Sequence, residues 1–553
     1  MSDRPIEAGR VIRGRIRPPG SKSMANRFLV LAAGASGTST IAGLPDGDDV
    51  QRMLAGIEAL GAVVDRLDST TVRITGLGGP PQVDARIEAA ASGTTMRFLT
   101  AFAAAGGGDV ELDGTPRMRE RPIRHLADAL RVLGAEVRHL GEPDFPPLAV
   151  RGPISGGTVR VDASVSSQFT TAVLLAAPHA AEDLTVGIEG AVVSRPYLKA
   201  TLDALGAFGI EVDETSDGWR ITAGTYAGHD VVVEPDASGA VYPWVGAAMT
   251  GGNVLVEGLT RLGNSQADLA VLDVLERMGA SVAQEVYGIR VEGPGTLRGV
   301  EADLSGCPDG ALALAVAAAV AEGPSRFTGL GTLRVKETDR LHALETELRK
   351  VGVVADAGPD WLEVRPGPLG PSSIATYDDH RMAMSFTLLG LVVEGIVIED
   401  PGCVSKTWPA FFDDLGAVSP PLVDVVAIDG PAGTGKTTVS KAVADALGRL
   451  RLDTGAFYRA ATLVAQRTDR PVDADLADVL AEHTFTYDDG VMRIDGEDVS
   501  TAIRTSEVTA GVSAVSAVAE VRSQMVDAQR DWVTTSGVGV VVEGRDIGTV
   551  VFP

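Results

Sequence analysis

Six evenly spaced copies of one pattern constrain what this 553-residue chain can fold into. A glycine that follows a leucine-containing helical segment and precedes alternating apolar residues recurs about every 70–75 residues, at Gly61, Gly134, Gly209, Gly279 and Gly352. A fixed interval of this kind indicates one supersecondary unit that buries its apolar face only against its neighbours. The pattern therefore predicts six α/β units over roughly residues 10–418.

A second series of segments keeps step with these glycines and predicts buried helices. Six apolar stretches begin about 71 residues apart, at Lys22, Gly93, Ser167, Ser238, Asp309 and His380. Helices that are apolar on nearly every side are buried. Each start on its own is also explained by an ordinary structural cap. Helix N-termini favour anions, however, and the charged residues at several starts predict a shared anion-binding cleft.

Composition narrows the classes of function. A total of 48 Lys and Arg against 74 Asp and Glu gives a net charge of −26, which argues against nucleic acid and anionic membranes as partners. No apolar run reaches the roughly 18 residues of a membrane span, and the N-terminus lacks the apolar core of a secretory signal. Two cysteines, Cys307 and Cys403, cannot build a disulfide framework or a zinc site. We expect a cytoplasmic, monomeric enzyme.

The scarce positive charges gather in a few short segments. These are Lys22 to Arg27, the three arginines of 117–121, Lys336 to Arg340, His380-Arg381 and the glycine-containing loop at Lys406. Ser23 and Arg27 lie four residues apart, on one helical face. Each cluster alone is equally well explained as a solvated surface. Their combination in an acidic chain predicts a site for small polyanions, because Arg grips carboxylates and phosphates and Lys adds point charges.

Eight blocks of this region resemble the 5-enolpyruvylshikimate-3-phosphate synthase family. In chain order they are PGSKSMANR, SGTTMR, PRMRERP, SVSSQF, SRPY, RVKETDR, DDHRMAM and CVSKTWP. The resemblance implies an α/β, two-lobed enolpyruvyl transferase fold of six repeated units over residues 1–418, with lobes of roughly 20–235 and 1–19 plus 236–418. It also implies transfer of the enolpyruvyl group of phosphoenolpyruvate to the 5-hydroxyl of shikimate 3-phosphate, a step of chorismate and aromatic amino acid biosynthesis, without a cofactor or metal.

The same resemblance assigns roles residue by residue. Asp309 would accept the hydroxyl proton, Glu337 would transfer a proton at the methylene carbon, and Lys22 would assist them. Shikimate 3-phosphate would contact Lys22, Ser23, Arg27, Ser166, Ser167, Gln168, Ser194, Tyr197, Asp309 and Lys336. Phosphoenolpyruvate would contact Lys22, Gly93, Arg121, Gln168, Arg340, Arg381 and Lys406. Gly93 further implies inhibition by glyphosate. Ala91 and Thr332-Leu333 depart from residues that many members carry.

Three other interpretations fit parts of the chain. UDP-N-acetylglucosamine enolpyruvyltransferases have the same fold and donor, but typically carry a cysteine in the loop that is 113–121 here, which has none. The SVSSQF and RVKETDR blocks also point away from that family. Alternatively, the chain is primarily a (d)CMP kinase whose first region is a scaffold, or its C-terminal part is a non-catalytic folding module. The complete set of cationic and acid/base residues in the first region speaks against a mere scaffold.

The C-terminal region begins after a proline-rich linker, 419–422, with an apolar strand over 423–429. The loop that follows has the G-x-x-x-x-G-K-T pattern, which cradles phosphates when it joins a strand to a helix. Lys436 would reach the terminal phosphates of ATP, and Thr437 would meet Mg²⁺. The predicted phosphate-binding residues are Gly430, Gly433, Gly435, Lys436, Thr437 and Thr438.

This region resembles cytidylate kinases through the blocks LDTGAFYRA, GEDVSTAIRTSEV and EGRDIGTVVFP. The resemblance implies a P-loop α/β domain over 423–553 that uses ATP and Mg²⁺ to phosphorylate CMP or dCMP. The nucleoside monophosphate would contact Thr454, Tyr458, Arg459, Ser513, Arg522, Arg545 and Asp546. Members of the family continue beyond the last block into a lid with further arginines. We therefore expect a partial domain with at most a vestigial kinase activity.

Overall fold

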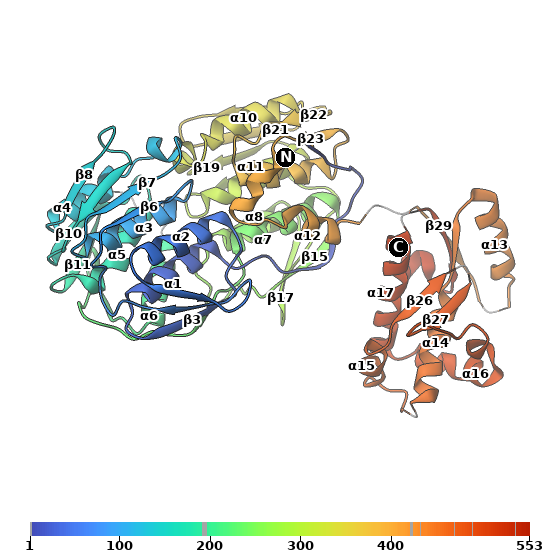
Figure 1. Ribbon diagram of the computed structural model, residues 1–553. Helices are drawn as coiled ribbons and strands as arrows, with labels where there is room; N and C mark the ends of the chain where they lie inside the picture. The colour runs from blue at the N-terminus through green and yellow to red at the C-terminus, as the bar shows by residue number, and fades with distance from the viewer. Residues whose placement is uncertain are drawn as a thin grey trace. The chain divides into compact units, whose positions relative to one another are not determined.

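The computed structural model describes residues 3–190, 196–420, 424–431, 433–468, 470–488, 490–536 and 538–552. The chain divides into two compact units, Met1–Ser419 and Pro420–Pro553 (Figure 1). Each unit has its own apolar core. The two units are therefore described one at a time.

Six small sheets of one design build the first unit. Three sheets have the orders β14 (Val231–Val232)-β3 (Thr38–Ala42)-β5 (Val72–Thr75)-β4 (Val63–Arg66), β6 (Ala85–Glu88)-β7 (Val110–Asp113)-β9 (Leu148–Arg151)-β8 (Glu136–His139) and β10 (Gly157–Asp162)-β11 (Leu184–Glu189)-β13 (Gly218–Ile221)-β12 (Val212–Glu214). The other three are β2 (Arg13–Ile16)-β15 (Asn253–Glu257)-β17 (Gly288–Glu292)-β16 (Ser281–Glu285), β18 (Glu301–Asp303)-β19 (Ser325–Thr328)-β21 (Leu362–Arg365)-β20 (Val354–Ala357) and β22 (Ser372–Ile374)-β23 (Ile396–Ile398)-β1 (Arg4–Pro5). In each four-stranded sheet the first pair is parallel and the next two pairs are antiparallel. The predicted repeat of six α/β units is confirmed.

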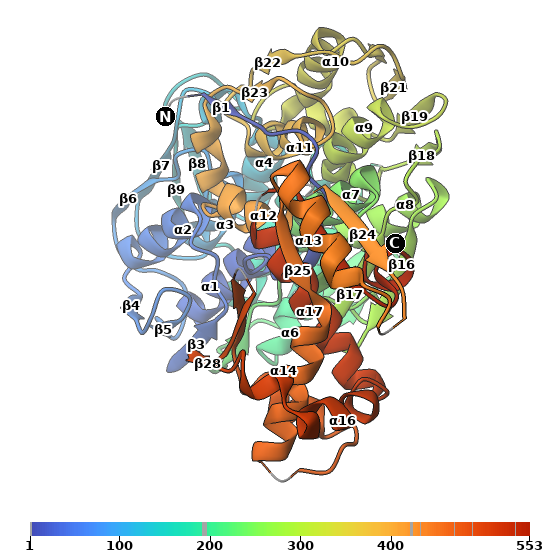
Figure 2. The ribbon, with the colours of Figure 1, turned by 90° about the vertical axis from the view of Figure 1, so that its right-hand side faces the viewer.

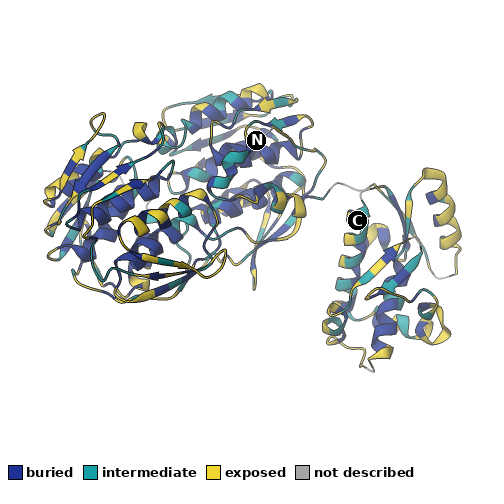
Figure 3. Ribbon diagram, in the orientation of Figure 1, coloured by how far each residue is buried: buried dark blue, intermediate teal, exposed yellow. Residues whose placement is uncertain are grey.

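Six buried helices fill the spaces between these sheets. They are α1 (Lys22–Gly34), α3 (Gly93–Ala104), α5 (Ser167–Ala176), α7 (Ala237–Thr250), α9 (Ala311–Ala319) and α11 (His380–Gly390). Their starts fall at or within two residues of the predicted positions. Asp309 lies in a short 3₁₀ turn, η4 (Pro308–Gly310), just before α9. Figure 3 shows the interior of this unit in dark blue, as expected of helices that are apolar all round.

A second set of helices covers the outside of the sheets. They are α2 (Asp48–Ala59), α4 (Arg124–Val132), α6 (Pro196–Ala207), α8 (Val271–Arg277), α10 (Arg340–Lys350) and α12 (Phe411–Val418). The five repeat glycines follow α2, α4, α6, α8 and α10, each with a positive φ between 69° and 107°. Only glycine adopts this left-handed conformation without strain, and it closes the helix there. The glycine repeat is thus a helix-ending signal.

Two apolar cores divide the first unit into two lobes. The first lobe draws its core from residues 24–233, and the second lobe from residues 12–16 and 237–418. The chain passes between the lobes near residues 16–24 and 233–237. In Figure 2 the helices α1 and α2 of the first lobe and α8 to α10 of the second lobe lie on opposite sides of the unit. Short 3₁₀ segments that border the lobes include η1 (Met118–Glu120), η5 (Gly331–Val335) and η6 (Pro401–Lys406).

The second unit is a parallel α/β layer with a small antiparallel sheet. The parallel sheet has the order β24 (Val425–Asp429)-β29 (Val540–Gly544)-β25 (Leu450–Asp453), and the other sheet β26 (Phe485–Asp488)-β27 (Val491–Ile494)-β28 (Glu497–Asp498). The helices are α13 (Lys436–Leu447), α14 (Thr454–Arg467), α15 (Leu476–Ala481), α16 (Ser506–Val515) and α17 (Ala519–Ser536). The G-x-x-x-x-G-K-T loop joins β24 to α13, as the sequence predicts.

Candidate active site

A cleft between the two lobes brings most of the predicted residues together. Its lining includes Lys22, Ser23, Arg27, Gly93, Arg121, Ser166, Ser167, Gln168, Tyr197, Asp309, Lys336, Glu337, Arg340 and Arg381. Lys406 lies at the edge of the cleft, where its ammonium contacts Glu337. Ser194 lies outside the described residues. The residues come from all six buried helices or the segments next to them, so the helix starts do converge.

The start of α1 supplies a buried guanidinium to the first-lobe wall. Arg27 donates hydrogen bonds to Thr201 Oγ1 at 3.0 Å, to the carbonyl of Ser23 at 2.6 Å and to the carbonyl of Tyr197 at 3.0 Å. Burial lowers the pKa of Arg27 to about 10, so the group stays charged at neutral pH. A fixed cation at the cleft wall is suited to a phosphate or carboxylate.

The start of α3 needs a glycine because two arginines pass close to it. A β-carbon on Gly93 would lie 2.7 Å from Arg97 Nη1 and 2.9 Å from Arg121 Nη2. Arg97 also donates to Gln168 Oε1 at 3.1 Å, which links α3 to α5. Burial and the charge of Arg121 lower the pKa of Arg97 to about 9. The glycine thus makes room for a cationic pocket.

One buried arginine organises the second-lobe wall. The side chain of Arg340 is 1% exposed and faces three carboxylates. It donates to Asp379 Oδ2 at 2.7 Å and to Asp309 Oδ1 at 2.8 Å, and it lies 3.0 Å from Glu337 Oε2. Because Asp379 also caps α11 by accepting from the N–H of Arg381, the network ties α10 to α11. Arg340 therefore fixes the positions of both predicted catalytic carboxylates.

Both predicted catalytic carboxylates are ionised by their neighbours. Burial alone would raise the pKa of Asp309, but the charges of Lys336, Arg381 and Arg340 lower it well below its usual range. Burial would likewise raise the pKa of Glu337, and the charges of Lys406, Arg340 and Arg121 lower it instead. Lys336 Nζ and Arg381 Nη2 each lie 3.5 Å from a carboxylate oxygen of Asp309. Asp309 is thus in the proton-accepting form.

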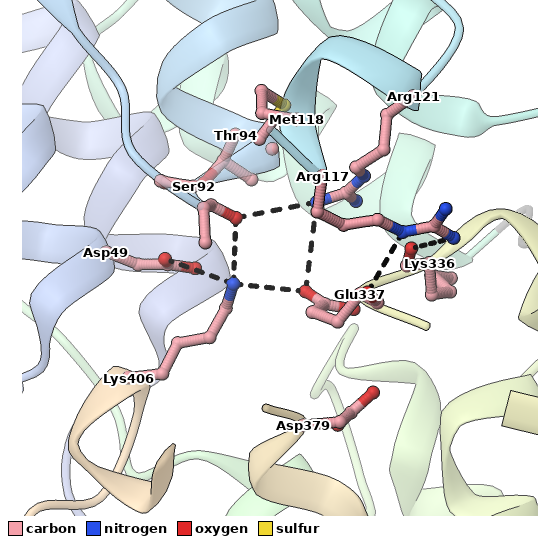
Figure 4. Close-up of polar contacts among 12 residues, drawn as sticks. Asp49, Ser92, Thr94, Arg117, Met118, Arg121, Lys336, Glu337, Asp379 and Lys406 are labelled. Atoms are coloured by element: carbon pink, nitrogen blue, oxygen red, sulfur yellow. Dashed lines mark hydrogen bonds and ion pairs between the residues drawn. The ribbon is translucent and has the colours of Figure 1, made fainter. Parts of the chain in front are cut away.

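Lys406 connects the two lobes at the edge of the cleft (Figure 4). Its ammonium donates to the carbonyl of Ala91 at 2.8 Å and lies 3.2 Å from Glu337 Oε1 and 3.6 Å from Asp49 Oδ1. The other oxygen of Asp49 lies 3.0 Å from Lys22 Nζ. One first-lobe carboxylate therefore bridges two of the predicted substrate-binding lysines.

The structure adds residues that the sequence did not single out. Nothing in the sequence marks Asp49 as a site residue, because acidic residues are common at the start of a helix. Arg97 could have been found, since it stands four residues after Gly93 inside the block SGTTMR. Ala91 is one of the positions where the sequence differs from many family members. Its backbone carbonyl accepts hydrogen bonds from Lys406 and Arg121. Thr332 lines the cleft with a buried hydroxyl that has no hydrogen-bond partner among the described residues.

The phosphate loop of the second unit is open and partly bonded to itself. Gly433 and Gly435 have φ values of 80° and 83°, which favour glycine. Lys436 Nζ donates to the carbonyl of Pro431 at 2.7 Å, and Thr434 donates to the same oxygen at 2.9 Å. Thr437 and Thr438 begin α13 and are exposed, and Gly430 follows β24. The two glycines of the loop and its lysine suit a polyphosphate ligand.

Some of the predicted nucleotide-binding residues of this unit are buried or paired with another side chain, and the others are exposed. Arg522 pairs with Asp546, and their charges influence the half-buried Tyr458, whose pKa burial raises. Thr454 is buried and donates to the carbonyl of Glu543 at 2.8 Å. Arg459 lies 3.4 Å from Asp453, at the start of the same helix. Ser513 and Arg545 are exposed, on α16 and directly after β29.

Comparisons with known proteins agree with this division of the chain. The family model described as EPSP synthase (3-phosphoshikimate 1-carboxyvinyltransferase) matches residues 6–415, and that described as cytidylate kinase matches residues 426–553. The 3-phosphoshikimate 1-carboxyvinyltransferase of Serratia proteamaculans is 44% identical over 418 residues, covering 74% of this chain and 97% of the relative. That of Bordetella pertussis is 43% identical over 427 residues, covering 74% and 96%.

Solved structures show the same fold. EPSP synthase from Acinetobacter baumannii aligns with a TM-score of 0.64 and 27% identity, over 75% of this chain and 98% of that one. The enolpyruvyl transferase NikO from Streptomyces tendae aligns with a TM-score of 0.60 at 19% identity, over 75% and 96%, and so shares the fold. The chain belongs to the EPSP synthase family, followed by a domain of the cytidylate kinase family. Both resemblances found in the sequence are confirmed. No helix in the described part of the chain is long and apolar enough to cross a membrane.

Proposed function

We propose that the cleft transfers the enolpyruvyl group of phosphoenolpyruvate to the 5-hydroxyl of shikimate 3-phosphate, with release of phosphate. The observation that carries this proposal is the pair Asp309 and Glu337, which one buried guanidinium, Arg340, holds at a cleft rich in cations. Acid/base groups next to clustered cations are what this reaction needs, because two anions must meet and two protons must move. Membership of the EPSP synthase family supports the same reaction.

The two substrates divide the cleft between them. We assign shikimate 3-phosphate to Lys22, Ser23, Arg27, Ser166, Ser167, Gln168, Tyr197, Asp309 and Lys336, with Ser194 as a further residue of the same set. We assign phosphoenolpyruvate to Lys22, Gly93, Arg121, Gln168, Arg340, Arg381 and Lys406. Guanidinium groups bind carboxylates and phosphates in bidentate fashion, and the ammonium groups add point charges. The assignment places the reacting carbons between Asp309 and Glu337.

The proton movements follow from the balance of the reaction. Adding a proton to the methylene carbon makes the neighbouring carbon electrophilic, and the 5-oxygen bonds there as its own proton passes to Asp309. Loss of phosphate and of one methyl proton then restores the double bond. Glu337 carries this proton in both directions. It is ionised by Lys406, Arg340 and Arg121, so we propose that the charges of bound phosphoenolpyruvate offset these cations and raise its pKa.

Lobe closure brings the cations of the first lobe to the acid/base groups of the second lobe. We propose that residues 20–235 and 1–19 plus 236–418 move as two bodies, with 419–422 as the linker to the second unit. The contacts of Lys406 with Ala91 and Asp49 join the lobes and belong to the closed arrangement. Closure excludes water and strengthens the interactions among the buried charges.

We also propose that the second unit binds ATP, Mg²⁺ and CMP or dCMP, the ligands of a kinase activity that we expect to be at most vestigial. Lys436 and the loop glycines would hold the phosphates, and Thr437 would meet the metal ion, which neutralises the charge of the transferred group. The monophosphate would contact Thr454, Tyr458, Arg459, Ser513, Arg522, Arg545 and Asp546. Agreement with the cytidylate kinase family supports this assignment. We place the whole chain in the cytoplasm as a monomer, in keeping with its two free cysteines.

Phosphate release tests the main proposal. The 553-residue protein is incubated with phosphoenolpyruvate, with and without shikimate 3-phosphate, and free phosphate is measured. We expect rapid release only when both are present, together with a product that contains both carbon skeletons. No release, or release that is independent of shikimate 3-phosphate, would contradict the proposal. ADP formation from ATP and CMP is measured separately, because the two sites belong to different units.

A further inference from the structure

We infer that Arg117 is a positioning residue of the synthase site, which holds the segment carrying Lys336 and Glu337 in place from across the cleft. The inference rests on the proposed function. Arg117 lies in the first lobe directly before η1, whereas Lys336 and Glu337 belong to the second lobe. It does not line the substrate cleft, so it acts through the residues that do.

All three guanidinium nitrogens of Arg117 have partners, and Figure 4 draws the bonds to Lys336 and Glu337. Nε donates to the carbonyl of Glu337 at 3.0 Å, and Nη2 donates to the carbonyl of Lys336 at 3.1 Å. Nη1 donates to Glu120 Oε2 at 2.8 Å, within the first lobe. The rigid guanidinium plane thus spans two consecutive carbonyl groups and is itself anchored, which a lysine could not reproduce.

The held segment has little other backbone support. Lys336 to Asp339 is an irregular connection between η5 and α10. Among the described residues, no backbone N–H donates to the carbonyl oxygens of Lys336 and Glu337. Backbone carbonyls are strong acceptors that are paired almost everywhere in folded proteins. Arg117 supplies the hydrogen bonds that a helix or sheet would supply elsewhere, and it does so only while the lobes are closed.

Free space next to the segment makes this restraint necessary. A second cavity of about 470 Å³ borders Glu337 and is also lined by Arg117, Arg121, Arg334 and Tyr377. Glu337 borders both this cavity and the substrate cleft. Without Arg117 the segment has room to relax outward and carry its carboxylate away from the substrate. A displacement of about 1 Å of a catalytic group lowers rates by about 100-fold.

The action of Arg117 is geometric, because the charges that set the ionisation of Glu337 belong to other residues. Burial, Lys406, Arg340, Arg121 and His380 account for the shifted pKa of Glu337. Removing Arg117 should therefore leave the shape of the pH–rate profile unchanged while the rate falls. A loss of folding would instead reduce every measured property together.

The test compares Arg117→Ala, Arg117→Lys and the matched control Arg119→Ala. Arg119 is two residues away from Arg117. Its guanidinium donates two hydrogen bonds to the carboxylate of Asp113, at 2.9 and 2.7 Å, but within the first lobe and not across the cleft. In Arg117→Ala we expect kcat to fall about 10- to 100-fold. The dissociation constant of shikimate 3-phosphate should change less than about threefold, because Lys336 is the only one of its proposed contacts on the held segment and the others lie on the remaining wall of the cleft. Arg117→Lys should lie in between, and Arg119→Ala within about twofold of the unchanged protein.

Chemical rescue completes the test. Guanidinium ion at low millimolar concentration should restore part of the kcat of Arg117→Ala and leave Arg119→Ala unaffected. Equal kcat in Arg117→Ala and the unchanged protein, or an equal loss in Arg119→Ala, would overturn the inference. If Arg117→Ala does not fold, Arg117→Lys is used instead. A fall in kcat with little change in shikimate 3-phosphate binding supports the inference, and an unchanged kcat overturns it. Failure of the unchanged protein to turn over would contradict the proposed function instead.

Discussion

The two units handle positive charge in opposite ways. In the synthase cleft, Arg340 and Lys406 are buried and each faces at least two carboxylates from different elements. In the second unit, Lys436 sits in a largely exposed loop and donates to a backbone carbonyl. Buried ion pairs interact strongly but are costly if a partner is lost, whereas exposed charges are screened by water. The synthase site is therefore preorganised by buried ion pairs, whereas the lysine of the phosphate loop is held by a single backbone carbonyl that water can replace.

The two units also differ in how completely they cover apolar surface. The six inner helices of the first unit are buried almost throughout. In the second unit, α13 leaves Val439 and Leu447 about half exposed, at 51% and 52%, and Figure 3 draws most of this helix in yellow. Fewer buried apolar contacts give lower local stability. We expect the second unit to unfold before the first.

The largest expected effect concerns the base in the synthase cleft. Asp309→Asn keeps the shape of the side chain but cannot accept the hydroxyl proton. General bases contribute about 100- to 10,000-fold, so we expect kcat for phosphate release to fall by about 1,000-fold or more. Binding of shikimate 3-phosphate, followed by calorimetry, should be largely retained because most of its proposed contacts remain. A variant with kcat near that of the unchanged protein would remove Asp309 from the mechanism.

The next prediction contrasts a buried with an exposed arginine. Arg340→Met leaves Asp309, Glu337 and Asp379 without their shared cation, and breaking a buried pair costs about 3–5 kcal/mol of unfolding free energy. Arg522→Met, in the second unit, removes a partly exposed pair and should cost less than about 1 kcal/mol. Hydrogen exchange during urea unfolding separates the two units. Equal losses from both substitutions would break the contrast drawn between the units.

A smaller effect is expected from added bulk at Gly93. The β-carbon of Gly93→Ala would lie 2.7 Å from Arg97 Nη1 and 2.9 Å from Arg121 Nη2, so these flexible guanidinium ends must shift. Glyphosate is longer than phosphoenolpyruvate and needs more of this space. We expect glyphosate to inhibit the unchanged protein. Gly93→Ala should raise the inhibition constant of glyphosate about tenfold, which is about 1.4 kcal/mol of binding free energy. The KM for phosphoenolpyruvate should rise less.

The matched control for that substitution is Gly79→Ala. The β-carbon added there meets no atom within 4 Å, so inhibition should not change. Full activity of the unchanged protein at millimolar glyphosate, with ordinary affinity for phosphoenolpyruvate, would contradict the prediction.

The smallest effect is a pH dependence of stability. Burial raises the pKa of Asp236 to about 6, only partly offset by Arg381. A raised carboxyl pKa stabilises the folded state below the unfolded pKa of about 4, and this contribution disappears as pH rises through about 6. Asp236→Asn lacks this dependence, so its stability relative to the unchanged protein should improve between pH 4.5 and pH 7. Urea unfolding at the two pH values measures this difference in stability. A difference that does not change with pH would show that the pKa of Asp236 is not raised.

Local features of the sequence predicted most of the fold. The repeat glycines and apolar stretches depend only on neighbouring residues, so Gly61 and the start of α3 were found at the right places. Asp49 and Arg117 each contact a residue more than 200 positions away in the chain, Lys406 and Glu337 respectively. Neither contact leaves a local pattern, because an aspartate at a helix start and an arginine in a loop are common. The site's cross-lobe connections therefore required the structure.

Deuterium incorporation tests most directly the claim that Glu337 moves a proton at the methylene carbon. The reaction is run in D₂O, and the vinyl hydrogens of recovered product and phosphoenolpyruvate are counted by mass spectrometry, for the unchanged protein and for Glu337→Gln. The account predicts solvent deuterium in the product of the unchanged protein, since the methyl group formed loses any one of its three hydrogens. In Glu337→Gln, both turnover and incorporation should fall together by about 100-fold or more. Incorporation and kcat that survive the substitution would contradict the account.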